Sequence, residues 1–214
     1  MAVLRPDREE MSAPAKGMPD KVAAPETGTT AVSSGLTEAF LAAFRHHPSG
    51  VAIITAEGAE GPVAMTVSSL ISISAAPPMV AFSLSASSSS GKVVERAASV
   101  VVHFVRRADM QLARLCATPG KNRFGPDVRW SRLDSGEPYY PQVELWFRAE
   151  LRDRLETSGA CLVTAELTSV SSGALVTRQA EALVYSNRAW HALGPVVDTV
   201  SAPMLLWPDD SATF

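Results

Sequence analysis

The alternation of hydrophobic and polar residues along the chain predicts more strands than helices. The run from Gly50 to Thr55 is apolar and rich in β-branched residues, EGAEGP over 57–62 indicates a turn, and a second apolar run starts at Val63. We therefore expect a β-hairpin that continues into a third strand and stops before Pro77-Pro78. The same patterns predict further strands over 79–85, 99–105, 143–151, 160–170 and 180–186.

Three segments have the spacing of helices. Leu36, Phe40 and Phe44 recur at one-turn intervals, and Pro48 ends that segment. A second helix is expected after the serine-rich run 83–90, and a third over 110–117 with Asp109 as its N-cap. About seven strands and three helices that do not alternate as βαβ units predict a mainly β fold, an antiparallel barrel with helices at its openings.

The two ends of the chain differ from its centre. Residues 1–35 hold four prolines and no aromatic residue, so we expect a disordered N-terminal arm, because it has too little to bury. Residues 36–193 are expected to form the folded domain, and 194–214 a proline-broken apolar extension. Within the domain, 118–142 holds four prolines and three glycines, and such a long loop usually serves function.

Composition removes several classes of function. The net charge of −3 gives no support for nucleic-acid binding. Two cysteines, Cys116 and Cys161, make no disulfide framework and no zinc spacing. His46 and His47 are adjacent, so on a helix they point about 100° apart and cannot share a metal. The chain shows no signal peptide and no long apolar window, so we expect a cytoplasmic protein with no membrane span and no metal.

The stretch Ser83–Ala98, SLSASSSSGKVVERAA, has two interpretations. It is a flexible serine run before a capped helix, or a phosphate site at a helix N-terminus, where unpaired amides and hydroxyls favour an anion. Ser89 or Ser90 is the expected N-cap, and Lys92 adds a positive charge. It is not a P-loop, because Ala86 stands where the first glycine is required.

The order of motifs is similar to that of the flavin reductase family, whose fold is an FMN-binding split barrel. FRHHPSGVAIITA is followed by the Thr66-Val67-Ser68-Ser69 element, Pro77-Pro78, SSSSGKVV, an Arg-Phe pair and a closing ALVYSNRAWHAL. The resemblance runs from about Phe40 to Leu193. It implies a six-stranded antiparallel split barrel with flanking α-helices that forms a homodimer. It also implies hydride transfer from NADH or NADPH to FMN or FAD, often for a partner monooxygenase.

The resemblance also implies which residues hold the flavin. The isoalloxazine ring is expected against the strand and turn of Met65, Thr66, Val67, Ser68 and Ser69. The phosphate is expected near Ser83, Ser85, Ser89, Ser90 and Lys92, with Ser87 and Ser88 in the approach loop, and the Arg123-Phe124 pair beside the flavin. No catalytic side chain is expected, because the cofactor carries hydride transfer and the protein supplies proximity.

One departure from the family leaves alternatives open. Many members carry Gly-Asp-His before the penultimate strand, with the histidine on the nicotinamide side of the flavin, whereas this chain has Gly159-Ala160-Cys161. The first hypothesis is an NAD(P)H-dependent flavin reductase. The second is a flavin-binding protein on the same barrel without reductase turnover. The third is a non-catalytic assembly partner that uses its two ends. His103, Trp190 and His191 are interpreted mainly as packing residues.

Overall fold

The computed structural model describes residues 29–171 and 181–193, in a chain that divides into two compact units, 1–41 and 42–214. The first predicted helix is confirmed as α1 (Thr29–His46), which begins inside the segment expected to be an arm. Leu36, Phe40 and Phe44 lie on this helix and are exposed. The predictions for residues 1–28 and for the extension 194–214 lie outside the described residues.

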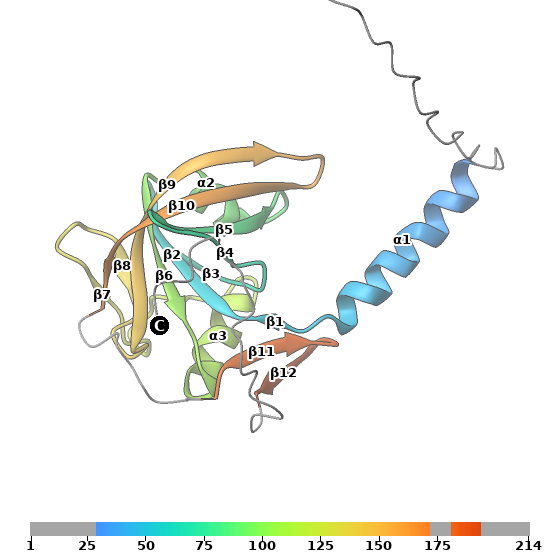
Figure 1. Cartoon of the computed structure of the whole chain (residues 1–214). Helices are drawn as coiled ribbons and strands as arrows, with labels where there is room; N and C mark the ends of the chain where they lie inside the picture. Colours follow the sequence, from blue (N-terminus) through green and yellow to red (C-terminus); the bar gives the residue numbers. More distant parts are fainter. Residues whose placement is uncertain (1–28, 172–180, 194–214) are drawn as a thin grey trace, which may run out of the picture. The chain divides into compact units, whose positions relative to one another are not determined.

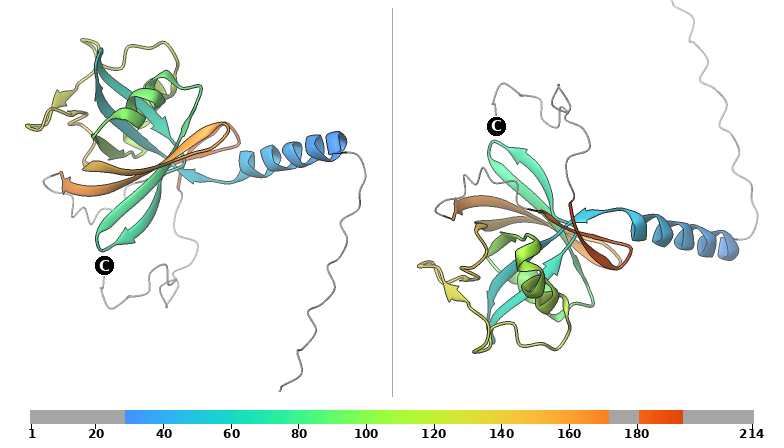
Figure 2. Two further views of the ribbon diagram at one scale, coloured as in Figure 1. Left: turned by 90° about the horizontal axis from the view of Figure 1, so that it is seen from above. Right: turned by 90° about the horizontal axis from the view of Figure 1, so that it is seen from below.

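The second unit is built on a seven-stranded antiparallel sheet in the order β3-β2-β6-β9-β10-β5-β4, which confirms the mainly β fold class (Figure 1). The strands are β2 (Ala52–Gly58), β3 (Gly61–Val67), β4 (Ile71–Ala75), β5 (Pro78–Ser85), β6 (Ser99–Phe104), β9 (Leu145–Glu156) and β10 (Ala160–Val170). This sheet has seven strands, one more than the six expected for the barrel. In Figure 2, β9 and β10 (orange) extend beside the β4–β5 hairpin (green).

The two edge strands of this sheet are consecutive in the chain. β3 and β4 lie at opposite ends of the strand order, and no ladder joins them within the described ranges. Residues 68–70 connect them, so the sheet is open along the segment that carries Ser68 and Ser69. Part of the element that the resemblance assigns to the flavin ring therefore connects the two edges of the open sheet.

Two small sheets complete the fold. β1 (Ser49–Gly50) pairs with β11 (Leu183–Ser186), which pairs with β12 (Ala189–Ala192). β7 (Ser131–Arg132) pairs with β8 (Pro138–Tyr139) inside the long loop. Asn187 and Arg188 connect β11 to β12 with φ values of 48° and 59°. Two successive positive φ values are typical of the type I′ turn, which matches the twist of a hairpin.

Strand β2 separates two hydrophobic cores. Ala52, Ile54 and Ala56 face the first core, while Ile53 faces the second. Because both faces are buried, the sequence of β2 reads as a continuous apolar run and not as an alternation. Helix α2 (Ser89–Arg96) adds Val94 to the first core, and α3 (Met110–Ala117) adds Ala113 and Cys116 to the second.

Helix α3 follows a short 3-10 turn, η1 (Arg107–Asp109). Asp109 occupies the predicted N-cap position, but its carboxylate makes no hydrogen bond to an amide of α3. It accepts instead from the backbone N–H of Arg106 at 2.9 Å. Burial raises the pKa of Asp109, although the Arg106 amide and side chain oppose the change. The carboxylate of Asp109 therefore stabilises the turn before α3 and does not cap the first amides of the helix.

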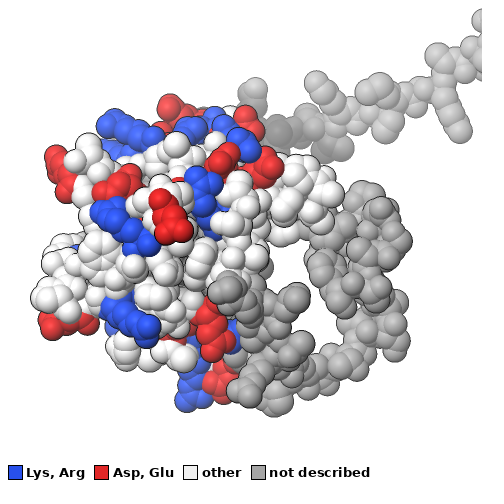
Figure 3. Space-filling model, turned by 90° about the vertical axis from the view of Figure 1, so that its left-hand side faces the viewer, with Lys and Arg blue, Asp and Glu red and all other residues white. Residues whose placement is uncertain are grey.

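Charges of both signs are interspersed over the face shown in Figure 3. Arg152 on β9 pairs with Glu150 and with Glu166 of β10, at 3.3 and 2.7 Å. This face therefore carries no large patch of one sign. None of the described helices combines the length and hydropathy needed to cross a membrane.

Candidate functional site

The serine-rich run leads into α2 through a capped turn. Ser88 is the N-cap, with φ −81° and ψ 119°, and its Oγ accepts from the Gly91 amide at 3.0 Å. The prediction of Ser89 or Ser90 as N-cap is therefore wrong. The cap requires the extended backbone that Ser88 has, whereas Ser89 and Ser90 are already helical. Gly91 permits the close approach, since a Cβ there would lie 3.0 Å from Ser88 Cβ.

This arrangement leaves the first turn of α2 available to an anion. Within the described residues, the amides of Ser89 and Ser90 have no acceptor. The Ser90 hydroxyl accepts from Nη1 of Arg123 at 2.9 Å, and Nη2 of Arg123 donates to the Thr118 carbonyl at 3.0 Å. The Nε of Arg123 is buried without a partner. Free amides, a hydroxyl and a guanidinium are the donors that a phosphate accepts from, so these residues fit the phosphate of a flavin.

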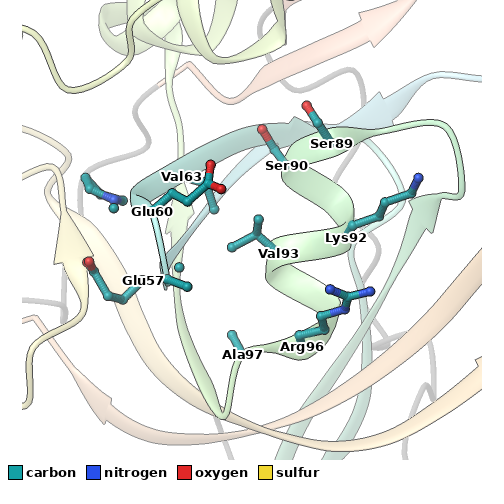
Figure 4. A pocket seen from close by; sticks show the side chains of 13 residues that line it. Glu57, Glu60, Val63, Ser89, Ser90, Lys92, Val93, Arg96 and Ala97 are labelled. Carbon is teal, nitrogen blue, oxygen red and sulfur yellow. The ribbon is translucent and has the colours of Figure 1, made fainter.

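A groove of about 630 Å³ lies between α2 and the β2–β3 hairpin (Figure 4). Ser89 and Ser90 lie at one end of it, and Lys92 and Arg96 extend along its α2 side. Glu57 and Glu60 supply the opposite charge from the hairpin. The hairpin approaches α2 closely at Gly58, where a Cβ would lie 2.6 Å from Cγ1 of Val93. Lys92 therefore lines the same groove as Ser89 and Ser90, and its contact with a phosphate remains a prediction.

The Thr66–Ser68 segment lines a separate hollow of about 390 Å³. The Thr66 hydroxyl donates to the Ala113 carbonyl at 2.7 Å and so ties β3 to α3. The other lining residues were not predicted as site residues from the sequence: Val51, Arg114, Ala117, Thr118, Tyr185 and Trp190. Trp190, interpreted as a packing residue, packs on Tyr185 at 5.2 Å and also lines this hollow.

Ser69 and Ser83 are brought together across the sheet edge. The Ser69 hydroxyl accepts from the Ser83 amide at 2.9 Å and lies 3.3 Å from the Ser83 carbonyl. Ser85 bonds Ser87 at 2.9 Å between exposed hydroxyls, and Met65 packs at the edge of the first core. The Ser69 hydroxyl thus joins the 68–70 connection to β5. The predicted contacts of these residues with the ring remain predictions.

The Arg123-Phe124 pair is anchored by aromatic residues. Phe124 stacks on Tyr140, with ring centroids 5.6 Å apart and planes 12° apart, and meets Trp130 edge-on at 5.1 Å. Thr118 connects two of the predicted site regions. Its carbonyl accepts a hydrogen bond from Arg123, and the residue also lines the hollow beside Thr66. The geometry therefore joins Ser90 to Arg123 directly, and Arg123 to the Thr66 hollow through Thr118.

The position expected for the family histidine holds a core thiol. Cys161 is 5% exposed and belongs to the first core. Burial raises the pKa of its thiol, so it stays protonated near neutral pH. Among the described residues, no cluster of histidine, cysteine or carboxylate side chains has the arrangement of a metal site. The chain thus offers no imidazole and no metal ligand set at this position.

Comparisons with known proteins identify the family of the chain. Residues 44–194 match the family model described as "Flavin reductase like domain". The NADH:FMN oxidoreductase of Rhodococcus qingshengii is 30% identical over 84% of this chain and 91% of its own length. The reductase subunit Stc3 of the stachydrine N-demethylase of Rhizobium meliloti is 27% identical over 62% of this chain and 58% of its own length.

A solved structure repeats the architecture. The flavin reductase domain protein from Arthrobacter sp. FB24 superposes with a TM-score of 0.69 at 28% identity, covering 77% of this chain and 99% of that one. The split-barrel fold that the sequence predicted is confirmed by this likeness and by the open antiparallel sheet. The chain belongs to the flavin reductase-like domain family.

Proposed function

We propose that this protein is an NADH-dependent flavin reductase that transfers a hydride from the nicotinamide to FMN or FAD. The family and the R. qingshengii relative support this reaction. The observation that carries it is the donor set at the start of α2. The free amides of Ser89 and Ser90, the Ser90 hydroxyl and the partly unpaired guanidinium of Arg123 converge there. Such a set binds a phosphate through charge-assisted hydrogen bonds and the helix dipole.

The chain's residues bind and orient the reactants. When bound, the flavin supplies the hydride-accepting chemistry, which needs no side-chain nucleophile. Ser89, Ser90, Arg123 and Lys92 hold the phosphate end. The open sheet edge at Ser68 and Ser69 receives the ring end, as the resemblance implies. Holding both reactants in one geometry removes much of the entropic cost of a bimolecular hydride transfer.

We further propose that the protein acts as a homodimer. Leu155 and Leu162 are cross-strand partners on β9 and β10, with 63% and 38% of their surface exposed, and Ile71 on β4 is 59% exposed. Ser83 is the β5 partner of Leu162, so this apolar face adjoins the Ser69–Ser83 pair. A second copy that covered this face would exclude water from the ring end. Sedimentation of wild type and of a Leu155→Lys, Leu162→Lys variant tests this, with a dimer and a monomer expected.

A partner enzyme and a cytoplasmic location complete the proposal. A relative that is the reductase subunit of a demethylase supports a second component that uses the reduced flavin, here a monooxygenase. Cys116 and Cys161 are both free thiols, which is usual in a reducing compartment.

The test of the reaction is NADH oxidation followed at 340 nm with FMN, with FAD and without flavin. Oxidation only in the presence of flavin is expected. No oxidation with either flavin and with either NADH or NADPH would refute the proposal.

The core thiol of Cys161, in place of the family histidine, favours one second candidate, a flavin-binding protein without turnover. That candidate predicts a flavin spectrum that NADH fails to bleach without oxygen.

A further inference from the structure

A buried histidine anchors the long loop from inside the second core. His103 on β6 is fully buried, and its Nδ1 lies 3.1 Å from the carbonyl of Ile53 on β2. Its Nε2 lies 3.0 Å from the backbone nitrogen of Tyr140. A backbone N–H can only donate, so Nε2 is the acceptor, and Nδ1 carries the hydrogen that it donates to Ile53. The imidazole therefore joins two strands to the loop and fixes the backbone of Tyr140.

Tyr140 transmits this anchorage to the Arg123-Phe124 pair by two contacts. Its ring, fully buried, stacks on Phe124. Its hydroxyl donates to the backbone carbonyl of Arg123 at 3.0 Å and also contacts the Cys116 sulfur at 3.5 Å. Burial raises the pKa of the Tyr140 hydroxyl, so it remains a donor throughout the neutral range. The loop has little regular structure of its own, so these contacts help to fix where the backbone of Arg123 lies.

Arg123 is the far end of this path. Its backbone is held by Tyr140, and its guanidinium reaches Ser90 and the Thr118 carbonyl. A forked guanidinium depends on its position more strongly than a point charge does, because its hydrogen bonds have fixed directions. A displacement of the Arg123 backbone would therefore misalign the donors at the start of α2.

We propose that Tyr140 is a positioning residue for flavin binding: its hydroxyl bond to the Arg123 carbonyl holds the guanidinium in register with Ser90. This inference rests on the proposed function, because it assigns the Arg123–Ser90 pair to the flavin phosphate. Tyr140 is fully buried, and the effect of its hydroxyl on the site passes through Arg123. Its removal should therefore weaken binding of flavin while the chemistry on bound reactants is retained.

The test is a Tyr140→Phe variant, which removes one oxygen and keeps the ring. The dissociation constant for FMN, measured by fluorescence titration without NADH, should rise about fivefold, the size of one net hydrogen bond. The KM for flavin should rise by a similar factor with little change in kcat. Tyr139→Phe is the matched control, because the Tyr139 hydroxyl makes no hydrogen bond to the described residues. It should leave both constants unchanged.

A double-mutant cycle separates positioning from general support of the core. In an Arg123→Ala background, Tyr140→Phe should cause no further loss of FMN affinity, because its effect passes through Arg123. Melting temperatures without flavin should identify any general loss of stability. A full additional loss in the Arg123→Ala background, or unchanged affinity in Tyr140→Phe alone, would overturn the proposal. Wild-type protein that binds neither FMN nor FAD would instead refute the proposed function.

Discussion

The two cores on either side of β2 are built from different chemistry. The buried members of the first core are aliphatic residues, Phe82 and a cysteine thiol, and it includes Ile54 and Val94. The second core includes Ile53, Cys116 and Tyr140, and the imidazole of His103 hydrogen-bonds within it. The first therefore stabilises the sheet without directional bonds. The second also holds one loop in one position, and that loop carries Arg123. Stability and site geometry can thus be perturbed separately.

The largest expected effect is a cavity in the first core. Ile54 is fully buried there, and Ile54→Ala should lower the free energy of unfolding by about 4 kcal/mol, from lost transfer energy and a residual cavity. The FMN affinity of the remaining folded protein should equal that of wild type. Urea unfolding and fluorescence titration in the native baseline measure the two quantities. A weaker affinity in the folded protein would show that the first core also positions the site.

Acid should act on the second core through His103. Burial lowers its pKa from 6.5 to about 4, so the unfolded chain takes up a proton that the folded protein does not. The free energy of unfolding should therefore fall as the pH decreases from about 6.5 to about 4, by about 3 kcal/mol in all. Protonation of Nε2 would also place its N–H against the backbone N–H of Tyr140, so that hydrogen bond would be lost. Urea unfolding across this range measures the loss.

A His103→Gln variant isolates this contribution. Glu137 is buried and, although burial alone would raise its pKa, hydrogen bonds from Ser135 and Ser99 lower it. Glu137 therefore adds its own loss of stability as the pH falls, in wild type and variant alike. Tyr140, which binds His103, and Cys116, which contacts the Tyr140 hydroxyl, both stay neutral in this range because burial raises their pKa values. An identical pH dependence in both proteins would contradict the assignment to His103.

The double variant Ser89→Ala, Ser90→Ala separates the anchor of α2 from its binding end. Val94 holds α2 in the first core, whereas the two serines lie in its first turn beside Arg123. We expect FMN affinity about tenfold weaker, because the variant loses two hydroxyls that can donate hydrogen bonds to the phosphate. The melting temperature without flavin should stay within a few degrees, because Ser88 still caps the helix. Unchanged affinity would return the serine run to a simple linker.

The sequence was informative where a pattern is local. The hairpin of β2 and β3, the strand β6 and the helix α3 follow from composition and periodicity, and motif order indicated the family. The N-cap was misplaced because four serines in a row, Ser87 to Ser90, leave the choice to backbone geometry. The His103–Tyr140 bond spans 37 positions and joins a strand to an aperiodic loop. No local pattern encodes such a pairing, so only the folded chain shows it.

Thr66 is expected to show the smallest effect. Its hydroxyl donates to the Ala113 carbonyl at 2.7 Å, so it links the edge strand β3 to α3 of the second core. Thr66→Val keeps the shape and removes that bond, and should lower the free energy of unfolding by about 1 kcal/mol. Since the hydrogen is already committed to Ala113, FMN affinity should change less than in the double-serine variant. Urea unfolding and FMN titration of Thr66→Val beside Thr66→Ser, which retains the hydroxyl, give the comparison. A large loss of affinity with unchanged stability would instead assign this hydroxyl to the flavin ring and make β3, and not only the loop, part of the binding machinery.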